Sequence, residues 1–231
     1  VLPHVFYEKI SPGLRETQTV KTEISAIQVD NDEGHDMSRW TGNVELSDRI
    51  DTGDIATEVK TGIIGSYYDV QKKPTGATTK TDDMDRVTPQ ASIGWRAPVS
   101  LAGSSRSMVL EPRLQFAYIG GKDRSADIPN RDSADYRIDE ANLFLLNRYQ
   151  GYDYLRPGSR ADMGVSAVAD DALVGDVTGF VGASYRLSGK PSSGLTVNDD
   201  DNLSDIVASL GINPDMPFQI NWSGRLASSD F

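Results

Sequence analysis

Apolar and polar side chains alternate at every second position along much of this chain. The clearest run extends from Met108 to Tyr118, where apolar side chains occupy the even positions and Glu111, Arg113 and Gln115 occupy odd positions. A period of two is typical of β-strands, because successive side chains of a strand point to opposite faces. We therefore predict a strand here with one apolar face and one polar face.

The same alternation recurs in segments that are separated by stretches rich in proline, glycine, asparagine and aspartate. Lys73-Pro74-Thr75-Gly76 is a typical connection of this kind. The further alternating segments are residues 20–26, 39–46, 58–63, 92–96, 181–187 and 218–223. Because helical periodicity is convincing nowhere, the pattern predicts about ten strands in an all-β fold.

Strand length distinguishes two all-β architectures. Strands of soluble sandwiches usually have about five or six residues, whereas a tilted strand that crosses a membrane needs about 9–11 residues. Several alternating runs here continue for about ten residues. We therefore predict part of a large antiparallel transmembrane β-barrel of the outer-membrane type, in which Glu111, Arg113 and Gln115 line the lumen. A soluble β-sandwich is the alternative.

Composition narrows the classes of function. The 231 residues carry 34 acidic and 23 basic side chains, which gives a net charge of −11. Nucleic-acid binding needs a basic surface, so no nucleic-acid partner is expected. The absence of cysteine excludes thiol nucleophiles and thiolate metal sites within this sequence. No apolar run approaches the roughly 20 residues of a membrane-spanning helix.

Residues 128–153 form the most distinctive segment, with the sequence IPNRDSADYRIDEANLFLLNRYQGYD. It combines Asp132-Ser133, Asn142-Leu143-Phe144 and the series Asn147, Arg148, Tyr149, Gly151 and Asp153. This order of motifs resembles the C-terminal barrel domain of the LPS-assembly outer-membrane proteins, also called organic solvent tolerance proteins (the LptD family). In that family a PN-DS element precedes NLF, and NR-aromatic-x-G-x-D follows.

The resemblance extends to other parts of the chain. Leu110–Gln115 resembles the LEPR-x-Q strand of the family, and Val1-Leu2-Pro3 is similar to the start of a barrel segment. Tyr154 departs from the pattern, since the family commonly has arginine there, and few motifs match after Gly189. The missing initiator methionine and signal peptide indicate that the sequence begins inside a longer precursor. We therefore expect residues 1–231 to be a fragment of one barrel domain.

The resemblance implies a function in transport. It implies that the barrel inserts lipopolysaccharide (LPS) into the outer leaflet of the Gram-negative outer membrane, as a translocon that is not an enzyme and needs no cofactor. The implied partners are LPS, outer-membrane lipid, periplasmic LPS-bridge proteins and an outer-membrane lipoprotein that plugs the lumen. A porin-like diffusion channel and a soluble carbohydrate-binding sandwich are the alternative functions.

Residues 120–161 are predicted to form a long functional loop, because an idle connection of this length is uncommon in a compact domain. The guanidinium of Arg148 suits a carboxylate, and the sequence offers Asp132 or Asp153 as its partner. Gly151 suits a turn that needs positive φ. Asn142 and Asn147 can each donate and accept hydrogen bonds. Leu143, Phe144 and Tyr149 can pack against a barrel wall or another chain. We expect these residues to fold the loop; direct contact with the sugars or phosphates of a glycolipid is the alternative.

Catalytic and metal sites find little support. His4 and His35 have no evident serine partner, so solvated side chains are expected for both. No pair of carboxylates is singled out for glycosidase chemistry. Acidic clusters at residues 30–36 and 199–205 lack the spacing of a known calcium loop and are expected to be solvated loop tips. We predict no catalytic and no metal-ligating residue.

Overall fold

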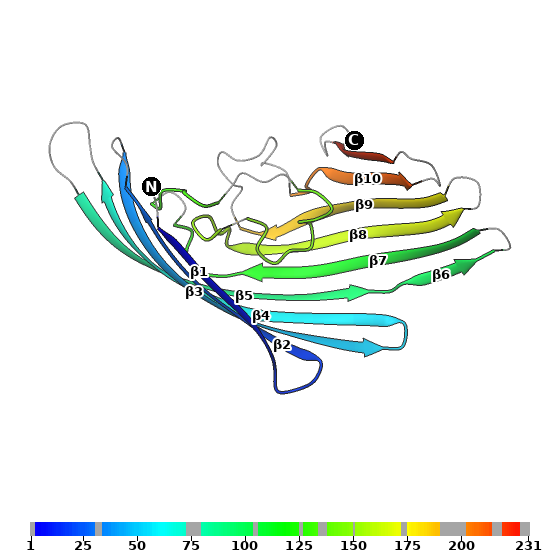
Figure 1. Cartoon of the computed structure of the whole chain (residues 1–231), viewed down its shortest axis with the longest axis horizontal. Coiled ribbons are helices and arrows are strands. Elements are labelled where there is room, and N and C mark those ends of the chain that lie inside the picture. The colour runs from blue at the N-terminus through cyan, green and yellow to red at the C-terminus, as the bar shows by residue number, and fades with distance from the viewer. Residues whose placement is uncertain are drawn as a thin grey trace.

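The computed structural model describes residues 3–30, 34–72, 80–103, 106–124, 127–133, 138–149, 151–171, 175–189, 202–213 and 219–226. The strands among these residues form one antiparallel sheet (Figure 1). Its strands are β1 (His4–Pro12), β2 (Gln18–Val29), β3 (His35–Thr52), β4 (Ile55–Lys72), β5 (Lys80–Arg96), β6 (Val99–Ala102), β7 (Arg106–Ile119), β8 (Gly158–Asp171), β9 (Gly175–Ser188), β10 (Ile206–Asn213) and β11 (Ile220–Leu226). The predicted all-β fold is confirmed, with 11 strands instead of about ten.

Neighbouring strands of the sheet follow the order of the chain. The order is β1-β2-β3-β4-β5-β7-β8-β9-β10-β11, and β6 pairs with β7 beyond the end of β5. β5 and β6 keep one register on β7, and Ala97-Pro98 separates them because proline has no N–H to donate. Within the described residues, β1 and β11 do not pair with each other, so the sheet is open.

The strands are long, and their two faces differ in polarity. β3 and β4 have 18 residues each. In β3, Arg39, Thr41 and Asn43 are buried, whereas Trp40 and Val44 are exposed. The alternation predicted for this segment is therefore present, but polar side chains occupy the covered face and apolar side chains the uncovered face.

Strands β4, β5, β7, β8 and β9 repeat this arrangement. On the covered face, the buried polar side chains include Ser66, Arg86, Thr88, Gln90, Ser92, Gln115, Asp162 and Ser184. On the opposite face, the exposed apolar side chains include Ile63, Tyr67, Val87, Ile93, Leu114, Phe116, Tyr118, Met163, Val165, Val181 and Tyr185. Soluble proteins bury apolar side chains and expose polar ones, so the polarity of this sheet is inverted.

The connections differ in length between the two ends of the sheet. One end of the sheet has short connections between strands, such as residues 53–54 between β3 and β4. The opposite end carries the longer ones, above all residues 120–157 between β7 and β8. The predicted loop of residues 120–161 therefore ends earlier than expected, since β8 already begins at Gly158 and pairs with Ile119.

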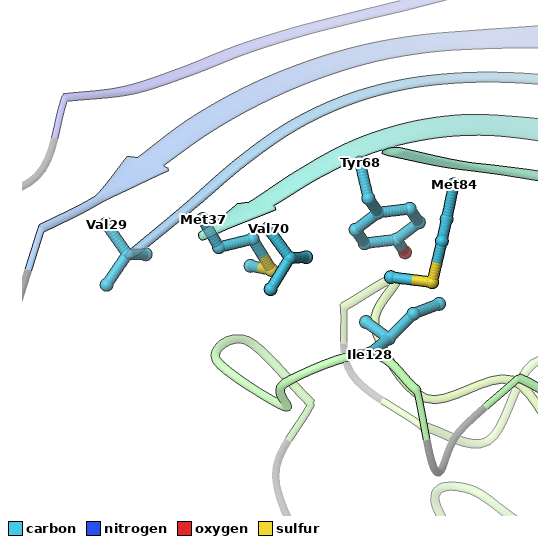
Figure 2. Close-up of a cluster of buried hydrophobic side chains, with 6 residues drawn as sticks. All are labelled: Val29, Met37, Tyr68, Val70, Met84 and Ile128. Carbon is cyan, nitrogen blue, oxygen red and sulfur yellow. The ribbon is translucent and has the colours of Figure 1, made fainter. Parts of the chain in front are cut away.

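Residues 120–157 are termed the β7–β8 loop below, and their described part lies across the polar face in the hollow of the curved sheet (Figure 1). A small apolar cluster joins the loop to the sheet, termed the wall below, near the end that carries the long connections. Figure 2 shows its members on the strands pointing toward Ile128 of the loop. The cluster consists of Val29, Met37, Tyr68, Val70, Met84 and Ile128.

Some sequence features fall outside the described residues. They are the connection Lys73–Gly76, Asp32 and Glu33 of the first acidic cluster, Asp199–Asp201 of the second, and Phe218 before the last strand. Among the described residues, no helix has the length and apolar character required to cross a membrane.

Candidate functional site

The β7–β8 loop is held on the polar face at two places, which we term the first and second anchors. The first anchor joins Asp132 and Asp153 of the loop to Arg39 and Arg86 of the wall. The second anchor joins the loop residue Arg148 to Asp162 of β8. Each anchor combines charge with burial, and the first brings together residues that are far apart in the sequence.

Asp132 and Asp153 first fold the loop upon itself. The Asp132 carboxylate accepts hydrogen bonds from the backbone N–H groups of Tyr152 (3.1 Å) and Asp153 (3.0 Å). The Asp153 carboxylate accepts in return from the backbone N–H groups of Arg131 (2.8 Å) and Asp132 (3.1 Å). These reciprocal bonds clamp two loop segments together and present both carboxylates to the wall.

Arg39 of β3 receives both carboxylates. Its Nη1 donates to Asp132 and, at 2.7 Å, to Oδ1 of Asp153. The Arg39 side chain is only 1% exposed, and it also lies over the Tyr152 ring with Cζ 5.5 Å from the ring centroid. A buried guanidinium without a charged partner would be strongly destabilising, so docking of the loop provides the counter-charges that Arg39 needs.

Arg86 of β5 contacts the loop backbone. It donates to the carbonyl oxygens of Tyr152 and Asp153, the latter at 2.9 Å, and to the Tyr68 hydroxyl at 2.7 Å. The Tyr68 hydroxyl in turn donates to the Tyr152 carbonyl. Arg39 and Arg86 together balance the charges of the two loop carboxylates, so the first anchor buries a neutral set of ions.

The two carboxyl groups of the first anchor differ in pKa. Burial alone would raise the pKa of Asp132, but Arg39 and the backbone N–H of Asp153 outweigh it and lower that pKa below its ordinary value. Burial raises the pKa of Asp153, and the neighbouring Asp132 charge raises it further. Asp132 is therefore the carboxylate whose ionised form the docked loop favours.

Gly151 is required by the geometry between these carboxylates. Its φ is +87°, a backbone conformation that residues other than glycine rarely adopt. A Cβ at this position would lie 2.4 Å from Cγ and 2.6 Å from the carbonyl oxygen of Asp132. The glycine thus lets the chain pass close to Asp132 while its carbonyl oxygen accepts a hydrogen bond from Asn147 at 3.3 Å.

Ser133 and Asn130 complete the fold of this region. Asn130 and Ser133 exchange hydrogen bonds between side chain and backbone, at 2.7 and 3.0 Å. The Ser133 hydroxyl accepts from the backbone N–H of Tyr154 at 3.0 Å and donates to Asp132 at 3.2 Å. Ser133 therefore links the two loop segments that Asp132 and Asp153 clamp together.

In the second anchor Arg148 bonds to Asp162, and not to Asp132 or Asp153 as the sequence suggested. Both of those carboxylates are already taken by Arg39, which lies far away in the sequence. Arg148 also donates to the Leu143 carbonyl at 2.7 Å and to the Ser184 hydroxyl at 3.0 Å. One guanidinium therefore closes a turn of the loop and fixes that turn to the wall.

The Asp162 carboxylate is fully buried, and both of its oxygens accept hydrogen bonds. Oδ1 accepts from Arg148 and from the Ser184 hydroxyl, the latter at 2.7 Å. Oδ2 accepts from Gln115 and from Nε of Arg160, each at 3.1 Å. The second anchor is thus built on three adjacent strands, β7, β8 and β9.

Leu143 and Phe144 add apolar contacts to the second anchor. Leu143 is fully buried with Phe180 and Val207, and Phe144 packs edge-on against Phe180 with ring centroids 6.5 Å apart. The absence of a side chain at Gly182 leaves room for Leu143, since a Cβ there would lie 2.6 Å from Leu143 Cδ2.

Asn142 and Asn147 act within the loop. Asn142 and Asp139 exchange hydrogen bonds between side chain and backbone, at 2.9 and 3.0 Å. Asn147 accepts from the backbone N–H of Tyr149 at 3.1 Å and donates to the Gly151 carbonyl. Both asparagines therefore satisfy backbone groups in a segment that has no regular secondary structure.

The three polar residues of β7 lie on the face that the loop covers. Gln115 is buried against Asp162, and the Arg113 guanidinium lies over the Phe144 ring, 5.9 Å from its centroid. Glu111 accepts a hydrogen bond from Nε of Arg113 at 2.5 Å. All three are therefore placed on one wall beneath or beside the loop.

The remaining candidates do not form a reactive or metal-binding centre in the part that the structure describes. The His4 imidazole lies 3.2 Å from the Ser25 hydroxyl, but the same hydroxyl accepts from Arg39, and no carboxylate orients the ring. Within the described ranges, no group of three or more histidine, aspartate or glutamate side chains can hold a metal ion.

The wall residues of both anchors, Arg39, Arg86 and Asp162, were not predicted as site residues. Arg39 begins the alternating segment of residues 39–46, and Asp162 follows directly after the predicted loop. A charged residue on the polar face of a long strand is the available signal, and it is not specific, because Glu45 and Arg160 share it on the same faces. Their partners could not be found in this way, because Arg39 and Asp153 are 114 positions apart.

Comparison with known proteins identifies the family of this chain. LPS-assembly protein LptD of Escherichia coli K12 is 29% identical over 178 residues, which are 72% of this chain and 22% of that protein. The LptD proteins of Shigella flexneri serotype 5b (30% over 138 residues; 56% and 18%) and Salmonella choleraesuis SC-B67 (28% over 156 residues; 63% and 19%) are similar. The matches thus span about a fifth of the relatives' length. Because the family model of LPS transport system D matches residues 1–231, this chain belongs to the LptD family.

Proposed function

We propose that this chain forms part of the wall of an outer-membrane β-barrel that moves LPS into the outer leaflet. The observation that carries the proposal is the inverted polarity of a sheet in an LptD-family chain. An apolar face with Trp40 64% exposed suits acyl chains, and a buried polar face suits the sugars of an amphiphile. The transport involves no bond making or breaking, so the protein acts as a translocon.

The outward side of β3 supports a position in the bilayer. Between Asp36 and Asp48, every outward position of this strand is uncharged. The interval is comparable with the about 9–11 residues that a tilted transmembrane strand needs. The outward positions in it are Ser38, Trp40, Gly42, Val44 and Leu46.

The connections support an orientation. Outer-membrane barrels have short turns on the periplasmic side and longer loops outside the cell. The end that carries residues 120–157 is accordingly the outer end, and the turn at residues 53–54 lies at the periplasmic end. The β7–β8 loop then enters the lumen from the cell surface, where it narrows the path that LPS would follow.

In this proposal the polar wall and the loop have separate roles. Glu111, Arg113 and Gln115 form part of the hydrophilic lining, and the loop residues of both anchors fold the loop over that lining. The partners are LPS, outer-membrane lipid, a lipoprotein seated in the lumen and the periplasmic proteins that deliver LPS. The protein is thus an integral component of the Gram-negative outer membrane and needs no cofactor.

The first experiment depletes the complete parent protein and measures newly made LPS at the cell surface. We expect surface LPS to fall while LPS accumulates in the inner membrane or periplasm. Unchanged delivery combined with altered uptake of small solutes would assign the protein to the porins instead. A protein that folds without detergent or lipid would indicate a soluble carbohydrate-binding sandwich.

Complementation then tests the loop. The parent protein with Asn147→Ala and Arg148→Ala should assemble poorly or bind its lumenal partner weakly, because both the loop turn and its bond to Asp162 are lost. Lys122→Ala, which alters an exposed side chain of the same loop, is the matched control. Normal assembly and normal outer-membrane permeability of the double variant would refute this role of the loop.

A further inference from the structure

The β7–β8 loop contacts strands across most of the width of the sheet. At one side the Tyr152 hydroxyl bonds to Glu23 of β2, and at the other side Glu140 accepts from Ser209 of β10 at 2.5 Å. The two anchors lie between these contacts, on β3 to β5 and on β7 to β9. Strands that never pair with one another are thereby connected through one segment.

The anchors are independent of each other in residues and in chemistry. The first is a charge-balanced ionic set of Arg39, Arg86 and two loop carboxylates. The second combines the Arg148–Asp162 ion pair with apolar packing of Leu143 against Phe180. Either anchor alone would attach the loop to the sheet at one place. Because both are present, the loop is fixed at two separate places of the sheet.

We propose that the docked loop is an internal strut that fixes the curvature of the wall between β3 and β9. The proposal rests on the barrel function proposed above, since it assigns the loop a role in setting the width of the passage. Without the strut, the two groups of strands would keep their hydrogen bonds and change their relative angle. The loop therefore determines the shape of the wall and does more than occupy the lumen.

The physical reason lies in the geometry of a bent sheet. Sheets bend and twist readily, because each pair of strands tolerates a range of angles. A change in curvature leaves the path along the sheet almost constant but alters the straight distance across its hollow. A segment fixed at both sides of the hollow (Figure 1) resists that change directly. Hydrogen bonds between neighbouring strands oppose it only weakly.

Distance measurement in the complete parent protein tests the strut. Spin-labelled side chains replace Val44 on β3 and Val181 on β9, which are both exposed on the outward face and touch neither anchor. Pulsed electron paramagnetic resonance of the protein in lipid then gives the distribution of distances between the labels. The variants are Arg39→Gln for the first anchor, Asp162→Asn for the second, and both together. Arg49→Gln and Asp170→Asn, exposed positions on the same strands, are the matched controls.

Loss of an anchor should broaden the distribution and shift it, with the largest effect in the double variant and none in the controls. Loop release is followed separately by cleavage with an added protease. An unchanged distribution in a variant whose loop is cleaved would overturn the proposal, and so would a double variant whose loop stays protected. If these variants do not insert into lipid, Leu143→Ala is scored in the same way, because it weakens the second anchor without leaving a charge unpaired.

The measurement distinguishes the strut from the transport function. The distance between the labels is recorded without LPS, whereas the transport function is judged by LPS at the surface of depleted cells. An unchanged distance distribution in variants with a released loop, together with loss of surface LPS on depletion, would refute only the strut. A broadened distribution in those variants, together with unchanged surface LPS on depletion, would refute only the LPS function.

Discussion

Burial decides which single residues matter at the anchors. The Arg39 and Asp153 side chains are almost completely inaccessible, whereas Arg49 on the same strand is 55% exposed beside Asp51. Exposed ion pairs contribute little, because water screens them and the side chains lose freedom. A buried pair behaves differently, since removal of one partner leaves a charge without compensation.

Arg39→Gln should therefore destabilise the folded protein by about 3–5 kcal/mol, since Asp132 and Asp153 would lose their shared counter-charge. Equilibrium unfolding in lipid vesicles measures the change. Arg49→Gln, the control on the same strand, should stay within about 0.5 kcal/mol of the parent protein. Equal effects of the two substitutions would show that the first anchor is not formed in the membrane.

Gly151→Ala tests backbone geometry without a change of charge. The positive φ and the contact with Asp132 predict a loss of about 1–3 kcal/mol and a loop that added protease cleaves faster. Gly65→Ala is the control, because a Cβ there meets nothing within 4 Å. Resistance of Gly151→Ala to the protease equal to that of the control would contradict the compact turn.

The pKa of Asp132 predicts how the loop responds to acid. This pKa is lowered in the docked loop, so the stabilising contribution of Asp132 is present above its ordinary value of 3.8 and disappears as the pH falls through the lowered value. Asp153 has a raised pKa, so the folded state favours its protonated form, and its protonation as the pH falls adds to stability. Protease protection of the loop should persist at about pH 5 and be lost below the ordinary pKa. The variant Asp132→Asn should show no such transition.

The sequence identified loop residues better than their partners. Asp132, Gly151 and Asp153 could be selected because they stand in a motif, and the need for positive φ at Gly151 follows from a local turn. The partner of Arg148 could not be selected, since Asp162 looks like any polar strand residue until β7, β8 and β9 are adjacent. Pairing between distant residues depends on the register of the sheet, which the local pattern does not contain.

Strands were predictable because their signal is local. The alternation in residues 39–46 and from Met108 to Tyr118 depends only on neighbouring positions, and β3 and β7 reproduce it. The end of the loop was less predictable, because Ser159 and Arg160 are polar and resemble loop residues although they pair in β8. Polar residues are as suitable as apolar ones for the covered face of this sheet, so polarity alone does not mark where a strand begins.

The outward face of β3 provides a test at the level of an element. Val44→Arg places a charge near the middle of the uncharged interval and should destabilise the protein in lipid by about 2–4 kcal/mol. Ile50→Arg, on the same face but beyond Asp48, should cost about 0–1 kcal/mol because it reaches the interface. Equal tolerance of both changes in vesicles would place β3 outside the bilayer.

At the scale of the whole molecule, the loop distinguishes a translocon from an open channel. Both alternatives use long strands with a polar inner face, so the sheet alone does not separate them. A hollow crossed by a loop that is fixed at two anchors restricts the flow of ions, whereas a diffusion channel needs an open path. The state of the β7–β8 loop should therefore decide the conductance of the complete protein.

Planar bilayers measure this property directly. The parent protein should remain mostly closed, and Arg39→Gln combined with Asp162→Asn should produce frequent open-channel currents, because release of both anchors frees the loop from the wall. Arg49→Gln combined with Asp170→Asn likewise removes one positive and one negative charge without changing the net charge, and it should leave the channel closed. Large currents in the unaltered protein would favour a porin, because a loop that is already docked would then leave a path wide enough for small solutes.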